Sequence, residues 1–452
     1  MSDVPTGPEI PRLDRRSFLR AGALGTVLGG AALLSACGDG VRNPGVPPLP
    51  GGTVVADDRA TWRIQGTPLL SADGSGRADG LTVAVTDLFA VQGQAIGAGN
   101  PAWLGQAEIQ TTTAASVTRL LSRGAAVLGI AQTVDFGFGH SGVNAAYGTP
   151  PNPAAAGRIP GGATSGASTA VARGAVSVGL GPDTTGSVRI PAAYQGLYGF
   201  GPTHAAVSTD GLMPLSRTFD TVGWVCSDAA TLAQVGDVLL PPVADADFGA
   251  AVTCPGLLAV ADDRVQSAIR DALAKWKRSG LPTLTEEEFD IAPLPDWYDA
   301  IVAVQGYEAW QQYGGWVSTS TGSIGDEARA NFLAASMVSE STYQRRLDEV
   351  RVAAQAVRDF LGSRVLLLPT AGSQAPPTTD DPGSVHVAAV LRTTGLLTSV
   401  ATVAGLPTAT VPVKTADGIP VGLSIVGPAG RDRDVLALAE QVAGTGIVAA
   451  RQ

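Results

Sequence analysis

The sequence predicts an α/β fold in which one sheet is buried between layers of helices. Short apolar runs typical of buried strands lie at residues 365–368, 408–413 and 421–426. Two other segments, 262–280 and 326–361, repeat apolar residues at the spacing of an amphipathic helix. Strands that are apolar throughout need cover on both faces, and amphipathic helices supply that cover.

The composition favours one large, compact domain. The 452 residues are 45% hydrophobic and only 15% charged, so the chain can bury a sizeable core. Length alone would allow two or three domains, but no linker interrupts residues 55–452, which we predict to be a single domain. The net charge of −10 argues against a nucleic-acid partner, because no basic stripe is available to contact phosphate groups.

Residues 1–36 are predicted to be a signal peptide. Arg15 and Arg16 precede an uncharged run from Ala21 to Ala36, a pattern that resembles the bacterial twin-arginine signal for the export of folded proteins. The run is too short and too rich in glycine for a permanent membrane span, which needs roughly 20 apolar residues. A short buried helix is the alternative interpretation.

Residues 37–54 are predicted to be a lipid-bearing tether. Cys37 ends the segment Leu34-Ser35-Ala36-Cys37, which resembles a lipobox, the signal for cleavage before a cysteine and attachment of lipid to it. Several prolines between residues 38 and 52 disfavour regular structure. We therefore expect an exported, extracytoplasmic lipoprotein held at a membrane by its lipid.

A stretch rich in glycine, serine and threonine, residues 161–187, contains two candidate ligand-binding loops. The first, Gly161–Gly166, allows close backbone approach and precedes a predicted helix, whose N-terminus favours negative charge. The second, Gly181–Ser187, places Ser187 beside several successive amide groups, as acyl transfer requires. A phosphate site is disfavoured because the lysine of a P-loop is missing. Without further information, Ser187 is either a nucleophile or a structural serine.

The later segments predict packing elements. In segment 262–280 the apolar positions at helical spacing are Val265, Ile269, Leu273 and Trp276. In segment 326–361 the candidate core contacts are Phe332, Leu333, Met337, Leu347, Val350 and Val357. Asp417-Gly418 predicts a turn that joins the last two strands.

Cysteine and histidine residues predict no metal site and no cofactor. Cys226 and Cys254 either pair in an oxidising compartment or remain as two buried free thiols. The three histidines, His140, His204 and His386, lie far apart in the sequence, without nearby cysteine partners.

A series of Gly- and Pro-rich motifs runs through the chain in a fixed order. They are Tyr147-Gly148-Thr149-Pro150, Asn152-Pro153, Gly161-Gly162, the segment from Gly186 to Ala193, Gly199, Pro202-Thr203, Asp210-Gly211, Pro214, and the segments 220–223, 366–370, 404–407, 418–423 and 425–428. Over about residues 80–445 this series resembles the amidase signature family. The resemblance implies a single α/β/α sandwich with a central twisted mixed sheet.

The resemblance also implies a catalytic apparatus, made of a nucleophilic serine, a bridging cis-serine and a lysine. Ser187 matches the nucleophile, and Asp183 and Arg189 match supporting positions. The oxyanion hole would be formed by the amides of Thr184, Thr185, Gly186 and Ser187. The family hydrolyses carboxamides, so the implied ligand is a small amide or carboxylate.

Two of the three catalytic positions are degenerate. Ala163 stands where the family has the bridging serine, and Thr86 stands where it has the lysine. The only lysines, Lys275, Lys277 and Lys414, lie far from these positions in the sequence. A threonine hydroxyl is no general base near neutral pH, so His140 is the best surviving candidate base, if it is not a plain loop histidine.

Three functions therefore remain open at the level of sequence. The first is a catalytically impaired protein whose cleft binds an amide or carboxylate, or a partner. The second is an active amide or ester hydrolase that uses Ser187 with a non-standard base such as His140 or water. The third is a structural envelope lipoprotein. Aromatic residues in segment 297–316, among them Tyr298, Tyr307, Trp310 and Tyr313, line a substrate pocket or serve helix packing.

Overall fold

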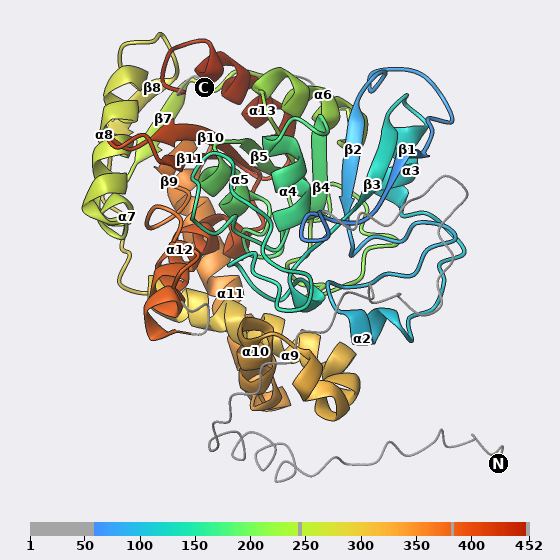
Figure 1. Ribbon diagram of the computed structural model, residues 1–452. Coiled ribbons are helices and arrows are strands. Elements are labelled where there is room, and N and C mark those ends of the chain that lie inside the picture. The colour runs from blue at the N-terminus through green and yellow to red at the C-terminus, as the bar shows by residue number, and fades with distance from the viewer. Residues whose placement is uncertain (1–57, 243–245, 381–383, 449–452) are drawn as a thin grey trace, which may run out of the picture. The chain divides into compact units, whose positions relative to one another are not determined.

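The computed structural model describes residues 58–242, 246–380 and 384–448, which share one mixed sheet (Figure 1). The signal peptide predicted at 1–36, the lipid site at Cys37 and the tether at 37–54 lie outside the described residues. The strand order is β1-β3-β2-β4-β6-β5-β10-β11-β9-β7-β8. Strands covered by helices confirm the predicted α/β fold.

The strands of this sheet are short. They are β1 (Trp62–Leu70), β2 (Thr82–Thr86), β3 (Ala126–Ala131), β4 (Val178–Pro182), β5 (Tyr198–Gly201), β6 (Val222–Cys226), β7 (Ala250–Thr253), β8 (Thr283–Glu286), β9 (Val365–Pro369), β10 (Thr408–Lys414) and β11 (Pro420–Val426). The pairs β2–β3, β2–β4, β7–β8 and β7–β9 are parallel, and the remaining pairs are antiparallel.

The helices lie between these strands along the chain. They are α2 (Pro101–Leu104), α3 (Ala115–Leu121), α4 (Ser165–Ala172), α5 (Arg189–Gln195), α6 (Ala229–Leu239), α7 (Pro255–Ala259), α8 (Asp263–Trp276), α9 (Leu294–Ser320), α10 (Asp326–Ser336), α11 (Glu340–Leu361), α12 (Val385–Ala404) and α13 (Asp432–Ala443). Short 3₁₀ turns lie at Asp135–Gly137 and Thr321–Ser323.

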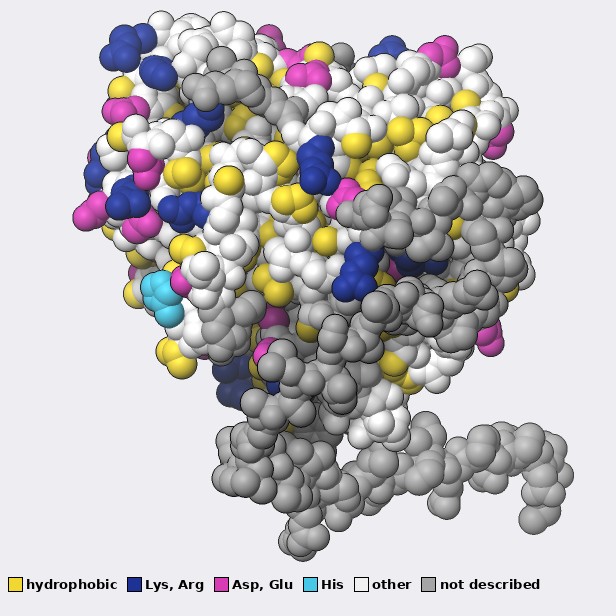
Figure 2. Space-filling view, viewed as in Figure 1, with side chains coloured by type: hydrophobic (Ala, Val, Ile, Leu, Met, Phe, Trp, Pro, Cys, Tyr) yellow, Lys and Arg dark blue, Asp and Glu magenta, His cyan; other side chains and the backbone are white. Residues whose placement is uncertain are grey.

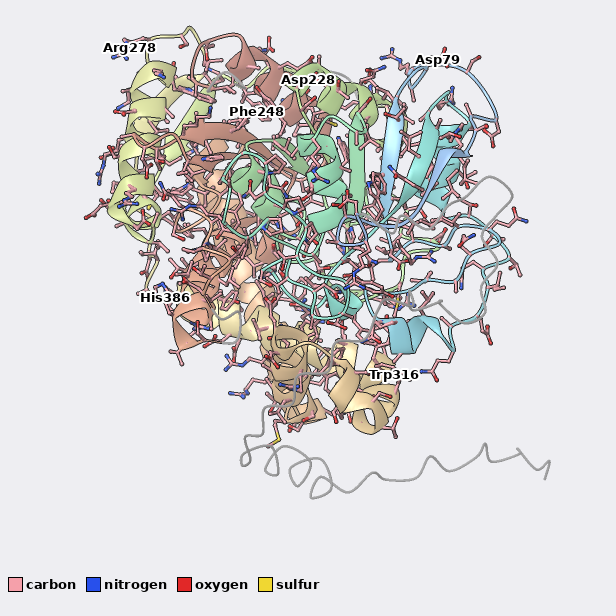
Figure 3. All side chains as sticks on the ribbon, viewed as in Figure 1. Asp79, Asp228, Phe248, Arg278, Trp316 and His386 are labelled. Carbon is pink, nitrogen blue, oxygen red and sulfur yellow. The ribbon has the colours of Figure 1, made fainter. Side chains whose placement is uncertain are left out.

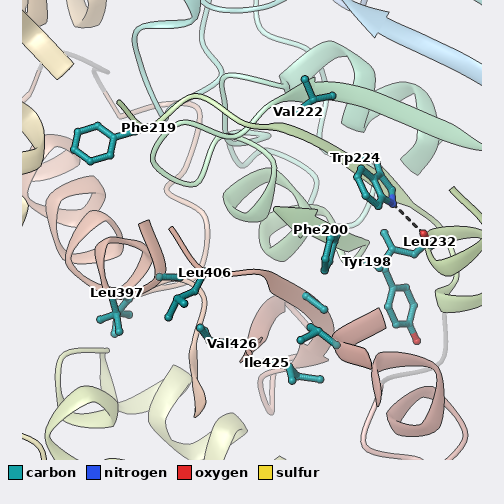
Figure 4. Close-up of a cluster of buried hydrophobic side chains, with 14 of the residues drawn as sticks. Tyr198, Phe200, Phe219, Val222, Trp224, Leu232, Leu397, Leu406, Ile425 and Val426 are labelled. Carbon is teal, nitrogen blue, oxygen red and sulfur yellow. Dashed lines mark hydrogen bonds between the residues drawn. The ribbon is translucent and has the colours of Figure 1, made fainter. Parts of the chain in front are cut away.

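The centre of the sheet is covered on both faces. On β5, a Cβ at Gly199 would lie 2.6 Å from Ala192 of α5, so this helix packs closely on one face. Side chains alternate along a strand, so the next residue, Phe200, faces the other side. There its ring lies 5.0 Å from Trp224, whose indole donates to the Leu232 carbonyl of α6 at 2.9 Å (Figure 4).

The three apolar runs near the C-terminus form strands as predicted. β10 and β11 pair as an antiparallel hairpin, with Val411 opposite Leu423. Their connection runs through Asp417-Gly418, and Gly418 adopts φ +81, a conformation that glycine adopts without strain. β9 then pairs with β11 on the other side of the hairpin.

The single long helix predicted at 326–361 is wrong, because the structure has two helices there. Ser339 caps the start of α11 by accepting from the Thr342 amide at 3.2 Å, which ends the preceding turn. Phe332, Val350 and Val357 are buried and Leu347 is half-buried, but Leu333 is 41% exposed and Met337 61% exposed. Leu333 lies within α10 directly after the buried Phe332 and so faces away from the side that Phe332 buries, and Met337 lies at the end of this helix.

The structure also shows the state of the two described cysteines, the burial of α12 and the distribution of surface charge. Cys226 and Cys254 are both buried free thiols. α12 is long and apolar enough to cross a membrane by length and composition, but most of it is buried within the fold. On the face shown in Figure 2, basic and acidic side chains are interspersed.

Candidate active site

Predicted site residues lie at the carboxyl ends of neighbouring strands of the sheet. Thr86 is the last residue of β2, and Asp183 directly follows β4, its parallel neighbour. Parallel strands end at the same edge, and loops at their carboxyl ends commonly form ligand sites in α/β folds. The sheet order therefore brings together positions about a hundred residues apart in the sequence.

The two glycine-rich loops are in direct contact. The amide of Thr164 donates to the Ser187 carbonyl at 3.1 Å, which places Ala163 beside the Ser187 loop. The Gly162–Ala163 peptide bond is cis, and the Ala163 carbonyl accepts from Thr133 Oγ1 at 2.8 Å. A Cβ at Gly181 would lie 2.1 Å from Thr164 Oγ1, so the closeness of the loops depends on glycine there.

The loop from Asp183 to Val188 presents free amide groups. Among the described residues, no protein acceptor is found for the amides of Thr184, Thr185, Gly186 and Ser187. Thr398 Oγ1 of α12 donates to the Thr185 carbonyl at 2.8 Å and so fixes this turn. Gly186 has φ +113, and a Cβ there would lie 2.9 Å from Thr398. Successive amides in a turn can stabilise an anion or a developing oxyanion.

Asp183 and Arg189 stabilise this loop through buried hydrogen bonds. Arg189 Nε donates to Asp183 Oδ2 at 2.7 Å, and both side chains are buried. The second carboxylate oxygen, Asp183 Oδ1, accepts from the Val188 amide at 3.3 Å. Arg189 continues to α12, where it donates to the Thr398 carbonyl and to Thr402. The pair links both ends of the loop to a core helix.

Asp220 is a further supporting carboxyl group. Its Oδ1 accepts from Thr184 Oγ1 at 2.7 Å, and its Oδ2 accepts from the amides of Leu215 and Ser216. Burial raises the pKa of Asp220 to about 7, against the lowering effect of these hydrogen bonds. Sequence reasoning assigned it no role, although it opens the motif at 220–223.

Thr86 and Ala163, the two positions predicted to be degenerate, are tightly packed. Thr86 is fully buried, and its Oγ1 donates to the Leu180 carbonyl of β4 at 2.8 Å. Ala163 is fully buried as well. Asp87, the residue after Thr86, lies 3.0 Å from Arg63 in a buried ion pair. Asp87 Oδ1 is engaged by Arg63 and by the Gly97 amide, whereas Oδ2 has no hydrogen-bond partner among the described residues, and burial raises the pKa of Asp87 to about 6.

None of the three described lysines lines the cavity described below. Lys275 and Lys277 are exposed on and just after α8, and Lys275 Nζ donates to the Gly446 carbonyl. Lys414 ends β10 and, like the other two, is not among the residues that line the cavity described below.

His140 contacts Thr185 rather than extending the serine relay. Its Nε2 lies 2.9 Å from Thr185 Oγ1. Removal from solvent lowers the pKa of His140 to about 4, with Asp183 raising it and Arg189 lowering it further. The imidazole is therefore neutral at neutral pH.

Glu327 of α10 holds the backbone on which His140 stands. Its carboxylate accepts from the amides of His140 and Ser141 and from the Ser141 hydroxyl. Desolvation raises the pKa of Glu327, against these hydrogen bonds. The sequence carried no signal for this contact, because 187 positions separate His140 from Glu327.

A cavity of about 530 Å³ opens beside these groups. His140 and Thr185 line it on one side. Helices α9, α10 and α12 contribute apolar side chains, among them Val302, Ala330 and Leu391. An ion pair between Arg392 and Asp299, with N and O atoms 2.6 Å apart, also lines the cavity. The space suits a small molecule with an apolar body and a polar end.

The aromatic residues of segment 297–316 serve mainly packing. Tyr298 lines the cavity, and the Arg392 guanidinium lies 5.0 Å above its ring. Tyr307 stacks on Tyr343, with ring centres 4.4 Å apart. Tyr313 packs against Phe136 and Trp103, as does Trp316, which Figure 3 labels in α9. Tyr307, Trp310 and Tyr313 do not line the cavity.

The described residues contain no group of three or more His, Cys, Asp or Glu side chains that could hold a metal ion.

The chain belongs to the amidase signature family: the model of the family described as "Amidase" matches residues 65–250 and 258–436. Amidase 1 of Arabidopsis thaliana is 33% identical over 399 residues, covering 80% of this chain and 92% of that protein. The chloroplastic outer envelope protein 64 of the same plant is also 33% identical, over 79% of this chain and 65% of its own length. A solved structure described as an amidase superposes with a TM-score of 0.73 at 26% identity, covering 82% of this chain and 86% of its own.

Proposed function

We propose that this protein is a catalytically impaired amidase-signature protein whose cavity binds a small amide or carboxylate without hydrolysing the amide efficiently. The observation that carries the proposal is the packing at the two relay positions. Thr86 donates its hydroxyl to a backbone carbonyl, and Ala163 has no hydroxyl, so a proton on Ser187 has no lysine to reach. Loss of triad members in serine hydrolases leaves only about 10³ to 10⁴-fold acceleration over water.

Binding is supported by the features that remain. The four amides at 184–187 have no described protein acceptor, and one residue of this loop, Thr185, lines the cavity of about 530 Å³. Oriented amides favour a carboxylate or the oxygen of an amide. Apolar residues from three helices would contact the rest of the ligand.

An active hydrolase that uses Ser187 with His140 as base has less support. The imidazole of His140 is paired with Thr185, and the contact of Ser187 with the first loop is made by its carbonyl. A purely structural lipoprotein is also less favoured, because such a role does not call for a cavity of this size. We further propose export through the signal at residues 1–36 and attachment of lipid to Cys37, on the sequence motifs alone.

Ammonia release from aliphatic and aryl amides tests the proposed impairment. We expect the wild-type protein to exceed the uncatalysed rate by no more than this residual factor of about 10³ to 10⁴. The double variant Thr86→Lys/Ala163→Ser should gain at least about 10²-fold, because it restores both the base and the bridging hydroxyl. Each single variant should stay near background, since the relay needs both groups.

The control adds Ser187→Ala to the double variant, which should remove the gain. Robust amide hydrolysis by the wild-type protein, lost on Ser187→Ala, would contradict the proposal. Calorimetric titration with small amides and carboxylates tests the binding half, and heat from none of them would favour the structural role instead.

A further inference from the structure

The contact between His140 and Thr185 is unexplained by the serine relay. Thr185 belongs to the loop of free amides, two positions before Ser187. Its Oγ1 lies 2.9 Å from His140 Nε2, and both residues line the cavity. A hydroxyl within hydrogen-bond reach of an imidazole is the arrangement of an activated nucleophile and its base.

We infer that Thr185 and His140 form an acyl-transfer pair, with Thr185 Oγ1 as nucleophile and His140 Nε2 as base, and that its substrates are activated carboxylic esters. The inference rests on the proposed function only in that the acyl group occupies the same cavity. It goes beyond that function because it assigns the residual chemistry to a pair of residues outside the Ser187 relay.

Two contacts hold the pair in place, and a third feature favours the reaction. Thr398 donates to the Thr185 carbonyl at 2.8 Å and so limits rotation of the turn. Glu327 accepts from the His140 amide at 2.7 Å and fixes the other partner from α10. The amides of Thr185 and of its neighbours have no described protein acceptor, so they are available to the oxygen that gains charge during attack.

The electrostatics of His140 determine which esters can react. Its imidazole is neutral at neutral pH, so Nε2 can accept the threonine proton when Nδ1 carries the ring hydrogen. An imidazole whose pKa is lowered to about 4 is a weak base, however. The pair therefore suits acyl groups with good leaving groups, such as phenyl esters, and not amides.

The reaction balances without a further reactant except water. Thr185 Oγ1 bonds to the carbonyl carbon as its proton moves to His140 Nε2. The bond to the leaving oxygen then breaks, and the phenolate departs with the electron pair and recovers that proton. Water attacks the acyl-threonine with His140 again taking a proton, which returns to Thr185 Oγ1 as the carboxylic acid leaves.

The test uses the mature wild-type protein and p-nitrophenyl acetate. We expect a burst of nitrophenolate and, after acid quenching, an acetyl group on Thr185, located by fragment-ion mass spectrometry that separates Thr185 from Ser187. An acetyl group on Ser187 overturns the inference, and so does the absence of both burst and adduct. Amide turnover measured in parallel reports on the proposed function separately.

Matched variants supply a second readout. Thr185→Val preserves the side-chain shape and should abolish the adduct, whereas Thr185→Ser should keep it. His140→Gln should slow acylation about 10²-fold. His386→Gln, at the exposed start of α12 (Figure 3), should leave the rate unchanged. Equal labelling of Thr185→Val and wild type, or loss in both Thr185 variants, overturns the assignment of Thr185 as nucleophile.

Discussion

Single buried carboxyl groups couple the candidate active site to pH. Asp220 holds Thr184 at the start of the amide loop, and burial raises its pKa to about 7. In the unfolded chain its pKa would be near the ordinary value of 3.8. Between these two values the folded protein binds a proton that the unfolded chain does not. The contribution of Asp220 to stability is therefore complete below the lower value and is lost as pH rises through the higher one.

This coupling predicts the behaviour of Asp220→Asn. Asparagine does not titrate, so the variant lacks the pH dependence that Asp220 gives to the free energy of unfolding of the wild-type protein. The difference in free energy of unfolding, wild type minus variant, should shrink from about pH 5 to about pH 8, by at most about 1.4 kcal/mol per pH unit. Urea denaturation at several pH values measures it.

The exposed Asp210 provides the control, because Asp210→Asn should show no such trend. A difference that is constant or grows over the same range would mean that Asp220 is already ionised in the folded protein at the lower pH.

At the scale of elements, the break between α10 and α11 shapes the cavity. α10 carries Glu327 and Ala330 to the cavity wall, while α11 packs against α9 and α12. Ser339 separates the two helices by capping α11. Without this cap the first turn of α11 would leave an amide unpaired.

We therefore expect Ser339→Ala to lower the free energy of unfolding by about 1 kcal/mol. Ser336→Ala, at the end of α10, is the matched control, because the exposed Ser336 hydroxyl only bonds back to the Leu333 carbonyl. Its effect should stay within about 0.5 kcal/mol. Equal losses in both variants would remove the cap as the reason for the break.

The sequence predicted some elements well and others poorly, for local reasons. β9, β10 and β11 are continuous apolar runs with a turn signal between the last two, so the local sequence pattern is enough to predict these strands. The break at Ser339 was not predicted, because the helical periodicity of apolar residues nearly continues across it. Leu333 and Met337 are apolar in sequence, yet Leu333 is exposed on α10 and Met337 is exposed at its end.

In the candidate site too, features carried by local sequence could be predicted, whereas contacts made only by the tertiary fold could not. The loops at 161–166 and 181–187 carry their own glycine signature, and their contact through Thr164 and Ser187 follows from the sheet order. The partner of His140 could not be predicted, because 45 positions separate it from Thr185 and no motif includes both. Glu327 likewise reaches the site only through the tertiary fold.

At the scale of the whole molecule, both cysteines in the described part of the chain are free thiols. Cys226 and Cys254 are free and buried, and burial raises the pKa of the Cys226 thiol well above its ordinary value. A thiol of this kind reacts slowly with oxidants and disulfides. Free, buried thiols at these two positions are compatible with the twin-arginine export proposed above.

The proposed anchor makes a prediction for Cys37→Ala. In cells grown with labelled palmitate, the wild-type protein should carry label and sediment with membranes, whereas the variant should lose both properties. Cys254→Ala should keep the label, because that thiol is buried. Unchanged labelling and sedimentation of Cys37→Ala would refute lipid attachment at this residue.

The close packing at Thr86 and Ala163 has a consequence for substitutions at these two positions. Replacing Thr86 by lysine would break a satisfied hydrogen bond and place an ammonium group in a fully buried position, where charge is costly. The Thr86→Lys variant should therefore be less stable than the wild-type protein. Selection for stability alone would disfavour a lysine at this position.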